Sequence, residues 1–251
     1  MDIAKFKNSV MLTARDLSLL QSLYEHTLLS FPQIVRIHFG SRSKPTVINR
    51  LTKLERAGLI ARLQVPRLMV VRSADVISVV YQITKFGISV LQKRSLDIEF
   101  RPEPVRIRPY SIDHDLLLVD VIEVLMIRYL GFKFVNGELF NTLAGSNGLK
   151  PDAVLLNPNG PEKIALELEL TAKSEKRYRE LILKYRLSKD FNKVVYVTSQ
   201  KQIESKIRSV LGAGSVSEKF QFLTLDHVLN TKPAPTINNF TEPRAPAGGL
   251  A

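Results

Sequence analysis

A stretch with three prolines and three arginines, RPEPVRIRPY at residues 101–110, most constrains how this chain folds. Proline fixes φ and has no backbone N–H, so these prolines disfavour a continuous helix there. A chain of 251 residues is long enough for two small domains, each with its own core. We therefore expect a two-domain protein of the α+β or α/β class, with a first domain at 1–100, a linker at 101–110 and a second domain at 111–229.

The end of the chain has a different composition. Residues 230–251 are rich in Pro, Ala, Asn and Thr and contain few side chains that a core could bury. Such segments bury too little apolar surface to offset the conformational entropy lost on folding. We therefore expect a disordered tail.

Positive charge is concentrated in the first part of the chain. Residues 1–110 contain 18 Lys and Arg against 8 Asp and Glu, whereas residues 111–251 contain 18 against 16. A basic half joined to a nearly neutral half indicates that the first half meets a polyanion. A solvated basic surface without a partner is the alternative interpretation.

Two further features of the composition exclude some classes of protein. The sequence has no cysteine, which excludes disulfides, thiolate zinc sites and a cysteine nucleophile. We see no apolar run long enough to span a bilayer and no signal-peptide core at the start. We therefore expect a cytoplasmic protein without direct membrane insertion.

The first block has the spacing of three helices, two strands and a closing helix. Thr13 is a plausible N-cap for the first helix, a second helix fits 32–38, and Pro45 suits the first turn of the third. Two strands follow at 59–65 and 76–84, around a loop with Arg67 and Arg72, before a helix that begins near Lys85. This order and the segment RLTKLERAGLI resemble the winged helix-turn-helix family.

That resemblance implies that the third helix enters the major groove of double-stranded DNA while the hairpin touches the backbone. Thr46, Asn49, Arg50 and Lys53 share one face of this helix. Asn49 and Arg50 are expected to reach base edges. The residues expected at phosphates are Arg42, Lys44, Lys53, Arg67 and Arg72. A merely solvated helix face is the alternative.

The second block predicts the element order αβββαβ with additions at its end. Helices are expected at 113–130, 173–188 and 201–213, and strands at 133–140, 153–157, 163–170, 193–199 and 220–225. The segment KIALELEL alternates, so Glu167 and Glu169 share one face of their strand. Glutamates in such a pattern often mark only a half-solvated strand.

This order, together with Pro151-Asp152 and Glu167-Leu168-Glu169, resembles the restriction-endonuclease-like PD-(D/E)xK core. In such a core, phosphodiester cleavage at neutral pH needs a divalent ion, and Mg²⁺ or Mn²⁺ suits a pair of carboxylates such as Asp152 and Glu167. The family's third residue is lysine, where this chain has Glu169. Glu169 can serve as a base or metal ligand, and the missing positive charge would come from Lys173 or Lys176.

Three other residues of this block are candidate accessory groups. His114 and Glu123 lie on the first predicted helix, and Tyr178 lies on the basic helix at 173–188. Each has a simpler interpretation: capping or packing for His114, solvent exposure for Glu123, and a place in the core for Tyr178 and Tyr185.

The two halves in this order resemble the replication-relaxation family, and especially MobC-type plasmid relaxases. The segment ELTAKSEKRYRELILKY at 169–185 is the most specific part of the likeness. It implies binding of a plasmid transfer origin, nicking of one strand, and assembly with an accessory mobilisation protein or coupling ATPase. The rival hypothesis is a non-enzymatic regulator or replication accessory protein whose second domain is a degenerate nuclease fold used for dimerisation.

Relaxases of the histidine-cluster type are excluded by the residues available. They need closely spaced metal-binding histidines and a catalytic tyrosine near the N-terminus. This chain has four scattered histidines: His26, His38, His114 and His227. Any cleavage must therefore depend on carboxylates.

Overall fold

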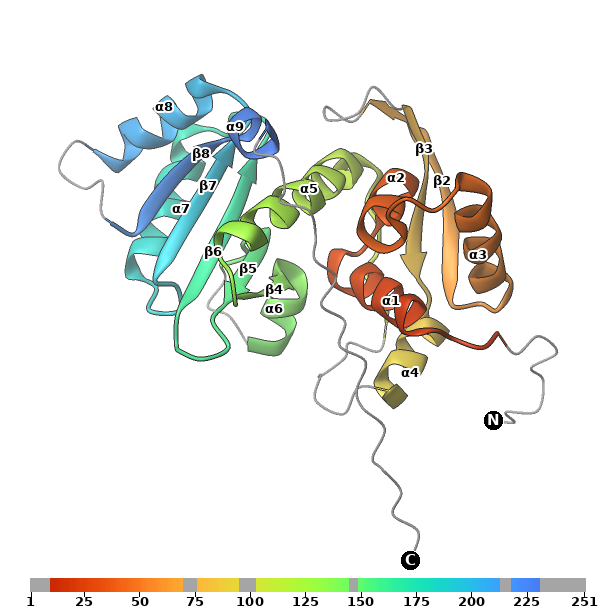
Figure 1. Ribbon diagram of the computed structural model, residues 1–251. Helices are drawn as coiled ribbons and strands as arrows, with labels where there is room; N and C mark the ends of the chain where they lie inside the picture. The colour runs from red at the N-terminus through yellow and green to blue at the C-terminus, as the bar shows by residue number, and fades with distance from the viewer. Residues whose placement is uncertain (1–9, 70–75, 95–102, 145–148, 213–217, 231–251) are drawn as a thin grey trace, which may run out of the picture.

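The computed structural model describes residues 10–69, 76–94, 103–144, 149–212 and 218–230 (Figure 1). Within them the chain is a mixed α+β protein with two separate β-sheets. Three of the sequence-based expectations lie outside the described residues: the tail after Asn230, Arg72, and the first two residues of the linker.

The first part of the chain is a helical bundle on a small antiparallel sheet. Its helices are α1 (Ala14–His26), α2 (Phe31–Ile34), the π-helix η2 (Val35–Phe39), α3 (Lys44–Arg56) and α4 (Lys85–Arg94). Its strands are β1 (Leu29–Ser30), β2 (Ile60–Met69) and β3 (Val76–Ile83), in the order β1-β3-β2. Apolar side chains from every one of these elements meet in one core.

Local sequence signals set the boundaries of these helices. Thr13 caps α1 in a capping box, in which its hydroxyl accepts from the backbone of Asp16 and the Asp16 carboxylate accepts from Thr13. Pro45 lies in the first turn of α3, and Gly58 follows its end with φ +71°, a conformation that favours glycine. The buried stripe of α3 is the expected one: Val47, Leu51 and Leu54.

The second part of the chain is a five-stranded mixed sheet with helices on both faces. Its strands are β4 (Lys133–Asn136), β5 (Ala153–Leu156), β6 (Lys163–Glu169), β7 (Lys193–Thr198) and β8 (Phe220–Thr224), in that order across the sheet. The pairs β4–β5 and β5–β6 are antiparallel, and β6–β7 and β7–β8 are parallel. The helices are α5 (Ile112–Arg128), α6 (Gly137–Ala144), α7 (Glu175–Leu187), α8 (Lys201–Leu211) and α9 (Leu225–Asn230), after the 3₁₀ turn η3 (Pro109–Ser111).

Two apolar clusters place these helices in layers. Leu166, Leu168 and Val195 belong to the same buried cluster as α5 and α9. Ala165, Val194 and Tyr196 instead pack with α7 and α8. Successive strand residues point to opposite faces, so these assignments put α5 and α9 on one face and α7 and α8 on the other. Both faces of β6 are therefore buried.

The structure corrects three details of the sequence-based prediction. Residues 137–140 begin α6 instead of continuing a strand, because the Asn136 side chain accepts the backbone N–H of Glu138 at 2.9 Å and caps a helical turn. Strand β2 extends to Met69, so Arg67 lies in the strand and not in a loop. A short helix, α9, follows β8, where the sequence had suggested only a strand.

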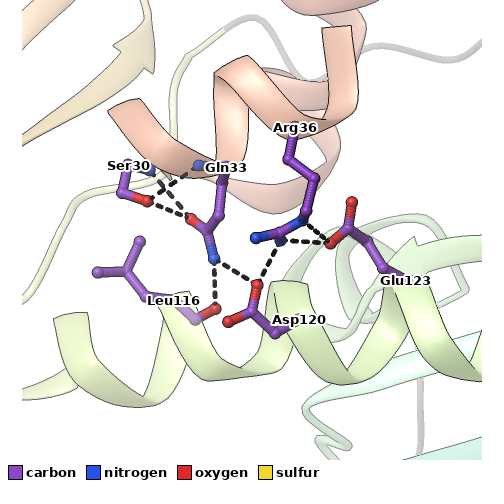
Figure 2. A network of polar contacts seen from close by, with 6 residues as sticks. All are labelled: Ser30, Gln33, Arg36, Leu116, Asp120 and Glu123. Carbon is purple, nitrogen blue, oxygen red and sulfur yellow. Dashed lines mark hydrogen bonds and ion pairs between the residues drawn. The ribbon is translucent and has the colours of Figure 1, made fainter. Parts of the chain in front are cut away.

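Helix α5 joins the two parts of the protein (Figure 1). Leu28, Ile77 and Val80 of the first part belong to the apolar cluster of α5. Polar contacts add to this interface, as Figure 2 shows: Gln33 donates to Leu116 O at 2.8 Å and to Asp120 at 3.1 Å. Asp120 is buried. The two parts are thus packed together, not merely tethered.

Arg36 and Ser30 complete this network (Figure 2). The Arg36 guanidinium contacts Asp120 at 2.6 Å and also pairs with Glu123. The Ser30 backbone N–H donates to the Gln33 side-chain oxygen at 3.0 Å, which fixes the amide that reaches α5. Buried polar groups with several partners specify one arrangement, so this network sets the register of α2 and η2 on α5.

The described part of the linker also contacts the first part of the chain. The Gln82 amide donates to Val105 O, and Lys85 pairs with Glu103. None of the helices in the described part of the chain combines the length and apolar character that a membrane span requires.

Candidate functional site

Asp152 lies immediately before β5 and binds the neighbouring strand β6 at two points. Its backbone N–H donates to Leu166 O at 3.0 Å, and its carboxylate accepts the Leu168 N–H at 2.7 Å. These two contacts lie on either side of Glu167. The antiparallel pairing of β5 with β6 therefore brings together Asp152 and Glu167, as the sequence predicts.

Gly137 fixes the backbone of the Pro151-Asp152 pair. Its N–H donates to Asp152 O at 3.1 Å, and a Cβ added at Gly137 would lie 1.6 Å from Pro151 O. No other residue type fits so close to this backbone. Sequence reasoning missed this positioning role, because nothing near Gly137 indicates which segment it contacts.

Glu167 is buried, with 4% of its surface exposed, and the Tyr185 hydroxyl donates to its carboxylate. Burial raises the pKa of Glu167 to about 8, with a further contribution from the negative charge of Asp152. The interpretation of a half-solvated strand is therefore wrong for this glutamate. Tyr185 belongs to the core, as expected, but it also holds a site residue.

Glu169 is also buried and pairs with Lys173. Burial raises the pKa of Glu169 although Lys173 opposes the shift. Burial alone would lower the pKa of Lys173, but the charges of Glu169, Glu167 and Asp152 raise it. Lys173 therefore carries the positive charge that faces the carboxylates. Lys176, the other lysine considered, is exposed on α7.

His114, near the start of α5, also lies beside these carboxylates. Its Nε2 lies 3.3 Å from the Asp152 carboxylate and 3.2 Å from Leu168 O, and its Nδ1 lies 3.3 Å from Asp115. Burial opposes the charged form, but hydrogen bonds to Asp115 and Asp152 and their negative charges raise the pKa of His114 to about 10. His114 is therefore a cation at neutral pH.

The other two accessory candidates differ in position: Glu123 lies away from these carboxylates, whereas Tyr178 lies beside Glu169 and Lys173. Glu123 pairs with Arg36 in the network between the two parts of the protein (Figure 2). Tyr178 is fully buried, and its hydroxyl accepts the backbone N–H of Lys173 at 3.1 Å. Tyr178 thus supports the segment that carries Lys173.

We refer to Asp152, Glu167, Glu169, Lys173 and His114 together as the acidic cluster. Its three carboxyl groups share two cations, and His114 also pairs with Asp115. Negative charge is therefore in excess, which a proton or another cation would relieve.

The geometry of the cluster bears on a metal site in two ways. Among the described residues, no group of three or more His, Cys, Asp or Glu side chains is arranged to hold a metal ion. Asp152 and Glu167 nevertheless offer two neighbouring carboxylates in a site with excess negative charge. Mg²⁺ commonly binds to one or two carboxylates, with waters and phosphate oxygens as its other ligands, so these residues fit such an ion.

The exposed face of α3 carries most of the residues expected at DNA. Thr46, Asn49 and Lys53 are exposed there, as are Arg42 and Lys44 before and at its start. These positions follow from the spacing of the buried stripe on the same helix.

Arg50 lies beside this face but is held by its own domain. Its guanidinium binds Asp16, with Nε to Oδ1 at 2.9 Å, and donates to Met11 O at 2.9 Å. The structure thus gives Arg50 a structural partner, and its contact with a base stays a prediction.

The fold and site define a class of protein: an α+β chain in which a basic helical domain is packed against a sheet domain with buried carboxylates. A family model described as replication-relaxation matches residues 20–192 of this chain. The match runs from within α1 to just beyond the end of α7 and includes the whole acidic cluster. The chain therefore belongs to the replication-relaxation family. No curated protein and no solved structure matched it.

Proposed function

We propose that this protein is a MobC-type plasmid relaxase, which binds a transfer origin and nicks one DNA strand with the help of Mg²⁺ or Mn²⁺. The observation that carries the proposal is the convergence of Asp152, Glu167, Glu169, Lys173 and His114 at one end of β6, described above. Membership of the replication-relaxation family supports a role in plasmid replication or mobilisation.

The first part of the chain is, on this proposal, a winged helix. The order of helices, the short strand β1 and the β2–β3 hairpin all fit that fold. Helix α3 would enter the major groove and the hairpin would contact the neighbouring backbone. Asn49 and Thr46 are exposed and suited to base edges, and Lys53 and Lys44 to phosphates.

The second part is, on the same proposal, a restriction-endonuclease-like core. An antiparallel β4–β5–β6 unit followed by a parallel strand β7 matches the expected αβββαβ order, with α6 as an insertion. Glu169 stands where the family has lysine, and Lys173 supplies an ammonium group in contact with Glu169. On this proposal, Lys173 would supply the positive charge that the family's lysine supplies.

The roles of the side chains follow from their charges and partners. A divalent ion supplies charge neutralisation at the scissile phosphate and a more acidic attacking water. Asp152 and Glu167 would hold it. Glu169 would accept the proton that the attacking oxygen loses as its new bond to phosphorus forms. His114 is cationic and would donate a proton to the deoxyribose oxygen that leaves as the old P–O bond breaks.

Nicking of supercoiled plasmid that carries the cognate origin tests this proposal. Wild type with Mg²⁺ or Mn²⁺ should produce open circles, and EDTA should prevent this. Asp152→Asn and Glu167→Gln should each lower the rate by a factor of about 100 or more, whereas Glu218→Gln, an exposed control, should not. Equal rates for wild type and both site variants would contradict the proposal.

The rival function, a non-enzymatic regulator with a degenerate nuclease fold, has one observation in its favour. Glu169 replaces the usual lysine and is itself neutralised by Lys173. Tight origin binding without nicking under either metal would establish this rival. In both cases we expect the protein to act in the cytoplasm on double-stranded DNA. An accessory mobilisation protein or coupling ATPase, or a second copy of the chain, would assemble with it.

A further inference from the structure

A cavity of about 380 Å³ lies between the two parts of the protein, beside the acidic cluster. Its lining includes His26 at the end of α1, Arg106 and Arg108 of the linker, and His114 and Asp152 of the cluster. Its volume falls in the range of pockets for small ligands, about 300–1,000 Å³. A ligand in this cavity would therefore touch both domains and two residues of the proposed active site.

Three cations line the rim of this cavity: Arg106, Arg108 and Lys150. All three are exposed, which shows that the cavity opens to solvent. The lining also contains three acids: Asp115, Glu138 and Asp152. His114 contacts Asp115 and Asp152 and offsets part of their charge. The three cations therefore favour an anionic group at the rim, while His114 and Asp152 of the acidic cluster line the same cavity.

An aromatic pair lines the same cavity. The rings of His26 and Phe134 are stacked, with centroids 4.8 Å apart and an interplanar angle of 16°. Burial lowers the pKa of His26 to about 4, with a smaller contribution from His38, so its ring is neutral. Its Nδ1 is buried without a hydrogen-bond partner among the described residues. Neutral aromatic rings are surfaces on which nucleobases stack.

We propose that this cavity holds one unpaired nucleotide of the DNA strand that is cut. Its base would lie against His26 and Phe134, and its flanking phosphates would meet Arg106, Arg108 and Lys150. A base in a duplex is stacked and paired, so only a single-stranded or flipped nucleotide can enter a cavity of this kind. This binding mode rests on the proposed nicking function and adds one step to it: the duplex opens locally beside Asp152.

Binding of a short single strand in EDTA tests the inference without cleavage. Fluorescence anisotropy compares a labelled single strand, the same sequence as a duplex, and a free nucleoside monophosphate as competitor. Arg106→Ala/Arg108→Ala should weaken single-strand binding about tenfold or more and duplex binding no more than about threefold. The control Lys184→Ala/Lys189→Ala removes two exposed charges from the end of α7 and the segment after it, which do not line the cavity, and it should change neither.

A second variant addresses the aromatic pair. Phe134→Leu keeps an apolar side chain but removes the ring, and it should weaken single-strand binding by a factor of about 5 to 150. Its thermal unfolding should stay cooperative, which separates lost stacking from lost folding. Photo-cross-linking of 5-iodouracil placed at successive positions should label the peptide that contains Phe134 at one position only.

The outcomes distinguish this inference from the proposed function. If no plasmid is nicked but the single strand binds and cross-links as described, the cavity assignment stands and the nicking proposal falls. If plasmid is nicked but neither variant affects single-strand binding, the cavity assignment is overturned and nicking stands. Competition by a free nucleotide as strong as by the oligonucleotide would also overturn it, because the ligand would then be a nucleotide and not a strand.

Discussion

Two groups of acidic side chains in this protein, each with buried members, balance their charge in opposite ways. In the first part of the chain, the fully buried Asp16 is matched by Arg50. In the second part, Asp152, Glu167 and Glu169 share Lys173 and His114. In the first group one carboxylate has a cation of its own, whereas in the second group three carboxyl groups share two cations.

The pKa shifts follow this difference. Burial would raise the pKa of Asp16, but hydrogen bonds from Arg50 and Thr13 and the charge of Arg50 lower it. Burial raises the pKa of Glu167 to about 8 and also raises that of Glu169, and the available cations do not reverse either shift. A satisfied buried charge builds structure, whereas carboxylates with too few cations form a site ready for a proton or a metal ion.

The largest effect is expected from breaking the satisfied pair. Asp16→Asn should destabilise the protein by about 3–5 kcal/mol, because it leaves the half-buried Arg50 without its counter-ion and weakens the capping box of α1. Urea unfolding at pH 7 measures this change. The exposed Asp113→Asn serves as control and should cost less than about 0.5 kcal/mol. A similar small cost for Asp16→Asn would show that the pair is not structural.

Removing a cation from the second region should act on activity more than on stability. Lys173→Met should lower the rate of plasmid nicking about 100-fold, equivalent to about 2.7 kcal/mol, because it deepens the excess of negative charge where a phosphate must approach. Lys176→Met removes the same charge three residues away on the exposed surface and should stay within about twofold. Equal losses in both variants would mean that only general attraction to DNA is involved.

A third prediction separates the recognition face from the structural pair beside it. Asn49→Ala should reduce the preference for cognate over random DNA about tenfold, a loss of about 1.4 kcal/mol, if its amide reads a base. Lys53→Ala should instead weaken both kinds of binding alike and reduce the salt dependence. Competition binding at two salt concentrations distinguishes these effects. An unchanged preference after Asn49→Ala would remove this residue from the base contacts.

The part of this picture that the sequence predicted depends on short-range patterns. The apolar spacing in 44–56 predicts which face of α3 is buried, and the alternation in 163–170 predicts that Glu167 and Glu169 share a face. The pairing of Asp152 with Glu167 follows from two neighbouring strands. Predicting these features requires only the hydrophobic period of one helix or strand, or the order of neighbouring elements along the chain.

The features that sequence reasoning missed join residues far apart in the chain. Gln33 and Asp120 are 87 residues apart, and Arg50 and Asp16 are 34 apart. Gly137 touches the backbone of Pro151. No local pattern specifies such partners, because they depend on how whole elements pack. For the same reason Glu123, which looks like a solvated residue of α5, lies at the interface with Arg36.

The smallest expected effect is a gain in stability when one carboxyl group of the acidic cluster is replaced by an amide. Glu167→Gln should stabilise the metal-free protein by about 1 kcal/mol at pH 7, because the amide keeps the shape of the side chain but needs no proton to be taken up on folding. The native pKa of Glu167, about 8, lies above the ordinary value of 4.5, so the native state binds more protons than the unfolded state between these two values. Wild-type stability therefore falls as pH rises through this window, and the variant should lack that part of the slope.

Urea unfolding in EDTA from pH 5 to pH 8 measures this difference, which should be smallest at pH 5 and largest near pH 8. Asp16 gives the opposite sign: its pKa is lowered, so its contribution is complete above its unfolded value of 3.8 and is lost as pH falls through its lower native value. If Glu167→Gln destabilises the protein at every pH, then Glu167 is as well satisfied as Asp16. The contrast between a structural pair and a site with excess negative charge would then fail.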